Sequence, residues 1–348
     1  MHEYVFDLET VRLAVVLGVI VSMLFYERLH LTTGGAIVPG YLAVFLPRPL
    51  FIAVALGVAY ATFYFVNHVL TRRVILYGRR KFEVEILTSL VLVAACTLAA
   101  GVLGGVRPEM AALYGIGFII PGIIAHDMKR QGPAKTFAAV LLNTAIVGLV
   151  IFIYHSLLHI APWYRRAEAP PFDEASLGYP PDLLFPAVFA SVGVGMMVFR
   201  HVGVRTGGFI MGAYWALVLL RPLDLAFALA VGAVTYLFVT RVLMRHMLLF
   251  GRRKLSMMVL AGAVFAWGAE LLIVAGTDGR WVPWSGFHVI TLFVPALLAN
   301  DAQRQGFFRS AWGAGLTAVG VFGLMNLLQA ARLALGVGRA EWLVPGFL

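Results

Sequence analysis

Apolar blocks as long as a bilayer-spanning helix recur along this chain and restrict it to one class of fold. Val11–Tyr26, Leu50–Leu70 and Ile86–Val106 are three of them. A helix rises 1.5 Å per residue, so it needs ~20 apolar residues to cross the ~30 Å hydrocarbon core. Only 13% of the residues are charged, too few to cover a water-soluble domain. The sequence therefore predicts an all-α, multi-pass integral membrane protein of the cell membrane.

The chain matches itself when it is shifted by about 173 positions. A constant shift over about a hundred positions indicates an internal duplication. We expect module 1 over residues 1–160, a Pro-rich interfacial linker over 161–180, and a degenerate module 2 over 181–348. The matches are Thr33-Gly34-Gly35 with Thr206-Gly207-Gly208, Arg48-Pro49-Leu50 with Arg221-Pro222-Leu223, Gly78-Arg79-Arg80-Lys81 with Gly251-Arg252-Arg253-Lys254, and Arg130-Gln131-Gly132 with Arg304-Gln305-Gly306.

Each module is expected to hold six transmembrane segments, about twelve in total, of which four are short and broken by Pro or Gly. If the short segments cross, the Arg72–Lys81 and Lys129–Lys135 loops fall on one side. The positive-inside rule favours that arrangement, with these loops in the cytoplasm. Eight spans plus four re-entrant segments is the alternative. In module 1 the segments lie at about residues 10–26, 34–47, 50–70, 84–106, 110–126 and 135–158.

A second symmetry lies inside each module. The stretch from Gly35 to Pro39-Gly40 resembles the stretch from Gly117 to Pro121-Gly122. Three segments precede the midpoint and three follow it, which indicates an inverted 3+3 repeat within each of two parallel modules. Short segments broken at matching positions of inverted halves point to a mid-membrane site in transporters.

The Gly-Arg-Arg-Lys sequence is the most distinctive feature of the basic loops. Arginine forks match carboxylate geometry, so these loops can dock an anionic substrate or a cytoplasmic partner. The simpler explanation is a loop that fixes topology and contacts lipid phosphates. Membrane topology requires only positive charge in the loop. The occurrence of the same four-residue sequence in both copies therefore favours docking. The net charge of +10 would suggest a nucleic-acid partner in a soluble protein. Here the basic residues lie in short loops between spans, which argues against nucleic-acid binding. The predicted docking residues are Arg79, Arg80, Lys81, Arg252, Arg253 and Lys254.

The breaks in the short segments predict a path for a polymer. A Pro-Gly pair frees backbone groups that only protein or water can satisfy inside a membrane. Close helix packing by glycine, and a helix cap at the aspartate, are the simpler alternatives. The predicted path residues are Pro39, Gly40, Tyr41, Pro121, Gly122 and Asp127.

No sequence pattern for catalysis, a cofactor or a metal is found. The chain has no Walker A sequence, no G-x-S-x-G and a single cysteine, Cys96. His155 and His159 have a spacing that suits a metal, but a third ligand is missing nearby. We therefore expect no catalytic residue, no cofactor and no metal site in this chain.

Module 1 resembles the PgsC/CapC membrane proteins of poly-γ-glutamate biosynthesis. The resemblance covers about residues 12–158. The chain departs from the family because it has two modules, and the second module lacks both Pro-Gly pairs. The matching stretches are Val38-Pro39-Gly40-Tyr41, Leu76 through Phe82, Gly115-Ile116-Gly117 through Ala125, and Arg130-Gln131-Gly132.

The resemblance implies a noncatalytic membrane subunit of a poly-γ-glutamate synthesis and export complex. A Mur-ligase-like PgsB/CapB subunit would use ATP to form the amide in the cytoplasm, and a PgsA/CapA subunit would act outside. This chain would anchor the ligase, contact lipids and guide the anionic polymer across the membrane. A stand-alone secondary transporter for a small anion or peptide is the alternative, and a scaffold without a pore is a third hypothesis.

Overall fold

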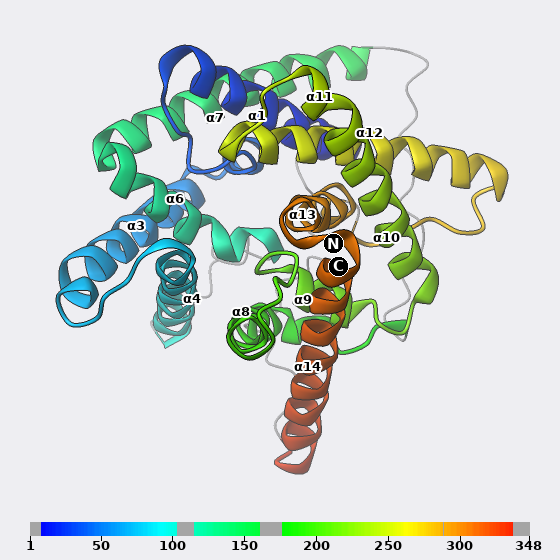
Figure 1. Cartoon of the computed structure of the whole chain (residues 1–348). Helices are drawn as coiled ribbons and strands as arrows, with labels where there is room; N and C mark the ends of the chain where they lie inside the picture. The colour runs from blue at the N-terminus through cyan, green and yellow to red at the C-terminus, as the bar shows by residue number, and fades with distance from the viewer. Residues whose placement is uncertain (1–7, 103–114, 161–175, 288, 337–348) are drawn as a thin grey trace. The chain divides into compact units, whose positions relative to one another are not determined.

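The computed structural model describes residues 8–102, 115–160, 176–287 and 289–336, and every regular element within them is helical (Figure 1). The chain divides into two compact units, with residues 8–160 in the first and 176–336 in the second. These units correspond to modules 1 and 2. Residues 161–175 of the expected linker lie outside the described ranges.

Module 1 contains long helices joined by short, broken ones. Their order is α1 (Leu8–Leu29), α2 (Val38–Val44), α3 (Pro49–Tyr64), η1 (Phe65–Val69), η2 (Leu70–Arg72), α4 (Gly78–Val102), η3 (Gly115–Ile119), α6 (Ile120–Gln131) and α7 (Pro133–Ile160). Proline stands in the first turn of α2, α3 and α6, where its missing N–H costs no hydrogen bond.

Module 2 repeats this order. It consists of η5 (Pro181–Leu183), α8 (Leu184–Val202), α9 (Met211–Leu217), α10 (Pro222–Leu237), η6 (Phe238–Leu243), α11 (Met244–His246), α12 (Gly251–Gly276), α13 (Ile290–Gln305) and α14 (Phe307–Ala334). Even the irregularities recur, because η1 and η6 are π-helical turns at equivalent positions. Such turns are rare and often lie at functional sites.

Eight of the described helical segments are long and apolar enough to cross a membrane. They comprise α1, α3 with its π turn, α4 and α7 in module 1, and the four equivalents in module 2. Two of the four short segments, those that contain α2 and α9, hold only a brief α-helix. Since α2 and α9 have 7 residues each, they are about 10 Å long and cannot cross as helices. The described residues thus hold eight long helices and four short segments, which is the predicted number of six segments per module.

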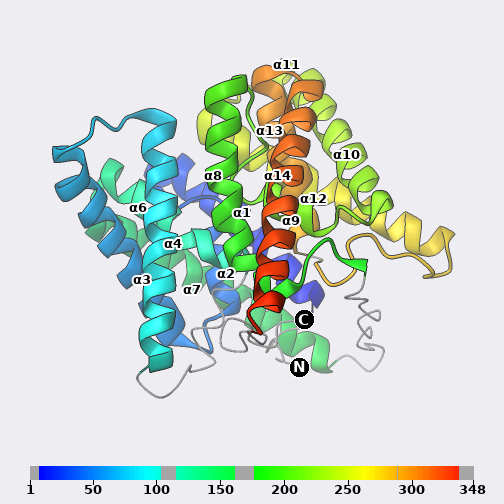
Figure 2. The same ribbon diagram turned by 90° about the horizontal axis from the view of Figure 1, so that it is seen from below.

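The helices of each module form two groups of three. In module 1, α1, α2 and α7 contact one another, and so do α3, α4 and α6, while α6 also contacts α7. In module 2 the groups are α8, α9, α14 and α10, α12, α13, and Figure 2 shows α8 and α14 running side by side. Exchanging the first half of a module with its second half maps each group of three helices onto the other group. The pattern agrees with a 3+3 repeat inside each module.

The short segments carry the chain along the depth of module 1. Gly34 lies against Val140 of α7, and Leu46 lies against Gly148, two turns further along α7. The segment therefore leads away from the end where α7 begins. In the other half, Gly122 of α6 packs on Ser89 of α4, and His126 bonds Glu85 nearer the start of α4. Because α6 thus returns to the end where α4 starts, the two basic loops lie at one end of module 1, as crossing segments predict.

The last residues of the expected linker pack into module 2. Leu177 and Tyr179 are buried. The Tyr179 hydroxyl donates to the carbonyl oxygen of Ala213 at 2.9 Å, and Gly178 N–H donates to that of Leu217 at 2.6 Å. Residues 176–180 therefore belong with module 2 structurally.

Candidate functional site: the basic ends of the modules

Each module gathers most of its described Arg and Lys residues at one end, which we call its basic end. Residues 27–32, 67–85 and 126–135 form it in module 1, and residues 200–205, 240–258 and 300–309 form it in module 2. Both ends hold nine Arg or Lys residues, but module 1 has four Asp or Glu residues there and module 2 has only Asp301. The acids in module 1 are Glu27, Glu83, Glu85 and Asp127. Module 2 therefore presents the larger excess of positive charge.

A glutamine joins two of the three parts of each basic end, the loop after the first helix and the turn before the last helix. In module 1, Gln131 Oε1 accepts from Thr32 N–H at 2.8 Å, and Gln131 Nε2 donates to the Thr32 carbonyl at 2.5 Å and to Thr136 Oγ1 at 3.0 Å. The following Gly132 has φ 87°, a conformation that side chains with a Cβ avoid. We call this arrangement the glutamine latch.

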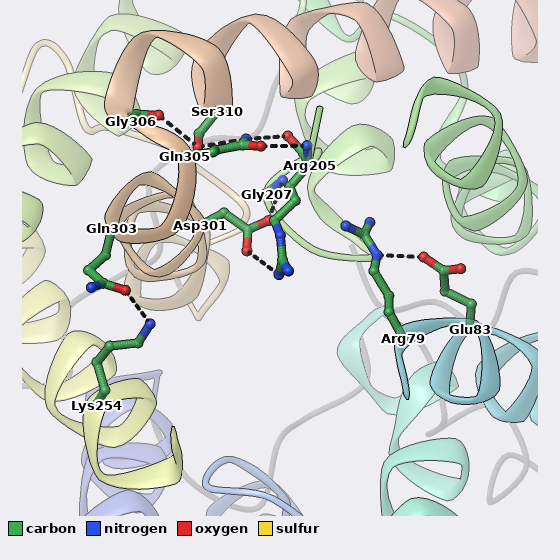
Figure 3. Close-up of polar contacts among 10 residues, drawn as sticks. All are labelled: Arg79, Glu83, Arg205, Gly207, Lys254, Asp301, Gln303, Gln305, Gly306 and Ser310. Atoms are coloured by element: carbon green, nitrogen blue, oxygen red, sulfur yellow. Dashed lines mark hydrogen bonds and ion pairs between the residues drawn. The ribbon is translucent and has the colours of Figure 1, made fainter. Parts of the chain in front are cut away.

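Module 2 has the same latch (Figure 3). Gln305 Oε1 accepts from Arg205 N–H at 2.8 Å, and Gln305 Nε2 donates at 2.9 Å to both the Arg205 carbonyl and Ser310 Oγ. Gly306 has φ 92°. The recurring Arg-Gln-Gly sequence is thus explained by structure: glutamine holds the loop after the first helix, and glycine makes the turn into the last helix.

Lys81 of module 1 lies in a buried polar cluster. It is 4% exposed and donates to Asn67 Oδ1 of the π turn, and its Nζ lies 3.7 Å from Glu85 Oε1. Glu85 is fully buried, and its other oxygen lies 2.6 Å from His126 Nδ1 of α6. Lys129 of α6 also interacts with Lys81. The cluster ties α3, α4 and α6 together.

The two arginines of the module 1 sequence are placed differently. Arg79 Nε donates to Glu83 Oε1 at 2.6 Å, one turn along α4 (Figure 3). Arg80 is exposed. The three predicted docking residues therefore do not form one cradle: Lys81 is inside the module, Arg79 is bound to an acid, and Arg80 faces outward.

Module 2 keeps the lysine and loses its acid partners. Ser256 and Met258 stand where module 1 has Glu83 and Glu85. Lys254 Nζ instead donates to Gln303 Oε1 at 2.7 Å (Figure 3). It interacts with Arg205, Arg304 and Asp301. Three cations thus surround a single carboxylate at this end.

The aspartate before the Arg-Gln-Gly turn does not cap its own helix. Asp301 Oδ2 accepts from Gly207 N–H at 3.1 Å, and its Oδ1 lies 3.9 Å from Arg205 Nη1. Both partners belong to the loop after α8, so Asp301 holds the Thr-Gly-Gly loop in place. Asp127 occupies the equivalent position in module 1 and is 1% exposed.

The glycines of the predicted polymer path lie at close helix contacts. A Cβ on Gly40 would come within 2.5 Å of the Ala14 carbonyl oxygen of α1, and one on Gly122 within 2.6 Å of Ser89 Oγ of α4. Pro39 and Pro121 are buried in the first turns of α2 and α6. Gly40 and Gly122 thus make the same type of contact in the two halves of module 1, each against the first helix of its own half.

Tyr41, the remaining predicted path residue, joins α2 to the start of the second broken segment. A Cβ on Gly117 would lie 2.6 Å from the Tyr41 hydroxyl, so this glycine makes room for the phenol. The ring also packs on Phe45, with centroids 5.1 Å apart. The equivalent Tyr214 is 1% exposed and packs on Phe287 at 6.2 Å.

Sequence reasoning missed three features of these ends. It assigned no role to Gln131 and Gln305, although both recur in the repeat. It did not single out Glu85, although an acid four residues after Lys81 within an apolar helix is itself a signal. It did not pair His126 with Glu85, which lies 41 positions earlier. Within the described ranges, no three His, Cys, Asp or Glu side chains are grouped as ligands for a metal.

The family comparison follows the duplication. The family model described as Capsule biosynthesis CapC matches residues 17–137 and again residues 190–311. Together these matches cover more than half of the chain. This chain belongs to the CapC family of capsule biosynthesis proteins. The two matches also show that it is a tandem form, with one copy of the family domain in each module.

Two curated relatives support the same assignment. The PGA biosynthesis protein CapC of Bacillus subtilis (strain 168) is 37% identical over 144 residues, which is 41% of this chain and 94% of the relative. The capsule biosynthesis protein CapC of Bacillus anthracis is 36% identical over 144 residues, which is again 41% of this chain and 94% of the relative. Each relative is thus about one module long. No solved structure matches this chain.

Proposed function

We propose that this CapC-family chain is the noncatalytic membrane subunit of a poly-γ-glutamate synthesis and export complex. Its basic ends face the cytoplasm, where they anchor an ATP-dependent amide ligase and receive the anionic polymer. The observation that carries this proposal is the convergence of distant basic loops at one end of each module. Family membership and the names of the two Bacillus relatives support the polymer's identity.

The charge balance assigns the stronger docking role to module 2. A polymer with one carboxylate per unit needs cations that internal acids do not neutralise. Arg79 and Lys81 have Glu83 and Glu85 as partners in module 1. Both acids are replaced by uncharged residues in module 2, so Arg252 and Arg253, which are not buried, face fewer acids there. Lys254 is 5% exposed and donates to Gln303, so it supports the site from inside the module. Loss of the Pro-Gly pairs does not make module 2 inactive in this proposal.

The docking role is tested with matched variants of the two modules. Arg252→Gln with Arg253→Gln is compared with Arg79→Gln with Arg80→Gln, after the membrane level of each variant is matched. We expect the module 2 pair to lower secreted polymer and ligase co-purification several-fold more than the module 1 pair. Unchanged polymer and ligase recovery in the module 2 pair would rule out the docking role.

The sidedness is tested by cysteine labelling. Ile75 and Leu248 are 86% and 79% exposed in equivalent loops. A cysteine replaces each in a chain whose natural Cys96 has been changed to alanine. A membrane-impermeant maleimide is expected to label both positions in opened vesicles and neither in intact cells. Labelling of either position from outside intact cells contradicts a cytoplasmic basic end.

A stand-alone secondary transporter is the second candidate. The exchange symmetry of helix contacts within each module favours it, because inverted repeats are typical of such proteins. Vesicles that contain only this chain separate the two functions. Concentrative uptake of glutamate or a short γ-glutamyl peptide supports the carrier, and polymer export that needs the ligase supports the proposed subunit.

A further inference from the structure

Asn143 lies near the middle of the spanning helix α7 in module 1. It follows Pro133, the first residue of α7, by ten positions, which is about 15 Å along the helix axis. The spanning part of α7 is Pro133–Leu157, so the side chain sits near the centre of the hydrocarbon core. Asn143 is 0% exposed.

The carboxamide of Asn143 has no hydrogen-bond partner within the described part of the chain, at either Oδ1 or Nδ2. Two other helix asparagines behave differently: Asn67 and Asn326 each donate to the carbonyl oxygen four residues earlier at 2.9 Å. Buried polar groups are nearly always paired in native proteins. An amide buried and unpaired at this depth is therefore evidence for a partner outside the chain.

The asparagine is on the face of α7 that meets the first broken segment. Val140 contacts Gly34, and Gly148 contacts Leu46, so the residues on either side of Asn143 along α7 border residues 34–46. The equivalent residue of module 2 defines the position of Asn143 more precisely. Thr317, its equivalent in module 2, lies against Gly212, the equivalent of Pro39.

Module 2 has removed this unpaired group. Thr317 donates its hydroxyl to the Gly313 carbonyl oxygen at 2.9 Å within its own helix. It therefore needs no external partner. The unpaired carboxamide is a property of module 1, which also keeps both Pro-Gly pairs.

We propose that Asn143 binds the amide groups of the polymer inside module 1, a role that rests on the proposed function. Oδ1 accepts from an amide N–H of the polymer, and Nδ2 donates to an amide carbonyl. Gln131 makes this pair with the N–H and carbonyl of Thr32 in the same module. Amides recur once per unit of a γ-linked chain, so one neutral carboxamide meets every unit without holding its charge.

Two variants of module 1 and one of module 2 test this role. Asn143→Leu keeps the volume and removes both polar atoms, and Asn143→Thr copies module 2. Thr317→Val is the matched control, because its hydroxyl is paired internally. We expect both Asn143 variants to keep wild-type membrane level and ligase recovery and to lower secreted polymer at least five-fold. Their thermal midpoint is expected to be no lower than that of wild type, because an unpaired buried amide has been removed. The control is expected to secrete normal amounts.

A binding measurement separates amide recognition from charge. The full chain in nanodiscs is titrated with a γ-linked glutamate hexamer and with a poly(acrylic acid) of similar length, which has carboxylates but no amides. Asn143→Leu is expected to weaken hexamer binding at least five-fold and to leave poly(acrylic acid) binding unchanged. Equal binding of the hexamer by wild type and Asn143→Leu overturns the proposal.

The remaining outcomes are also decisive. If Asn143→Leu unfolds more easily than wild type and secretes polymer in proportion to its reduced level, the amide has a structural partner and the proposal fails. If deletion of the whole chain leaves polymer secretion intact, the proposed function fails. If deletion abolishes secretion and Asn143→Leu restores it fully, only the role of Asn143 fails.

Discussion

Replacing Gln305 with methionine tests whether the latch holds the basic end of module 2. Methionine fills a similar volume and makes none of the three hydrogen bonds. The Arg205 N–H and carbonyl, bound at 2.8 and 2.9 Å, lose their partners. A buried group left unpaired costs about 1–3 kcal/mol. Because both hydrogen bonds are only part-buried, the loss in the free energy of unfolding is expected in the lower part of the ~2–6 kcal/mol range for two such groups. Ser310 keeps its second bond to Gly306.

The loss is measured by reversible unfolding of the purified chain in mixed micelles, with tryptophan fluorescence as the signal. Six of the seven tryptophans lie in residues 181–348 and none lies in residues 1–160, so the signal reports mainly the module that carries the change. Gln329→Met is the matched control, because Gln329 is half-buried on α14 and outside the latch. A Gln305→Met midpoint equal to that of the control would refute the latch.

Two further predictions concern module 1. Lys81→Met removes the cation 3.7 Å from the buried Glu85, which keeps its contact with His126. This predicts a loss of about 1–3 kcal/mol, and Lys81→Met with Glu85→Met is expected to recover part of it. Thermal midpoints of the single and double variants in a double-mutant cycle measure this, and additive losses would contradict the pairing. Gly40→Ala places a Cβ 2.5 Å from a carbonyl oxygen of α1 and is expected to cost about 1–3 kcal/mol. Gly57→Ala, where nothing lies within 4 Å, is expected to be neutral or stabilising, and equal midpoints for the two alanine variants would contradict the close packing of α2 on α1.

The fold was predictable where the signal is local or repeated. Long apolar blocks define α1, α3, α4 and α7, and the shift of about 173 positions predicts their equivalents. The short segments were recognised as unusual from Pro39-Gly40 and Pro121-Gly122. Their mixed structure was not predictable. The first of them combines extended chain with a helix of 7 residues, and together these extend further across the module than a helix of 7 residues alone.

The candidate site was predictable only in part, because identical residues in the two copies have different partners. The Gly-Arg-Arg-Lys sequence occurs in both copies, but Lys81 lies near Glu85, whereas Lys254 donates to Gln303. These differences depend on positions that do not repeat, such as Glu85 against Met258. Contacts between distant residues, such as Glu85 with His126, leave no trace in the spacing of either residue. Charge alone therefore predicted where the site is, but not which cations are available to a ligand.

Duplication explains how the two modules came to differ at both the basic end and the membrane centre. Under the proposed function, a chain with a single module would use one set of residues both to bind the polymer's charge and to meet its amides. Here module 2 lacks the acids that oppose the cations of module 1, and module 1 holds an unpaired Asn143 where module 2 has an internally bonded Thr317. Each change would weaken one task if it occurred in both copies. Their occurrence in opposite copies is what separation of charge docking from amide binding requires.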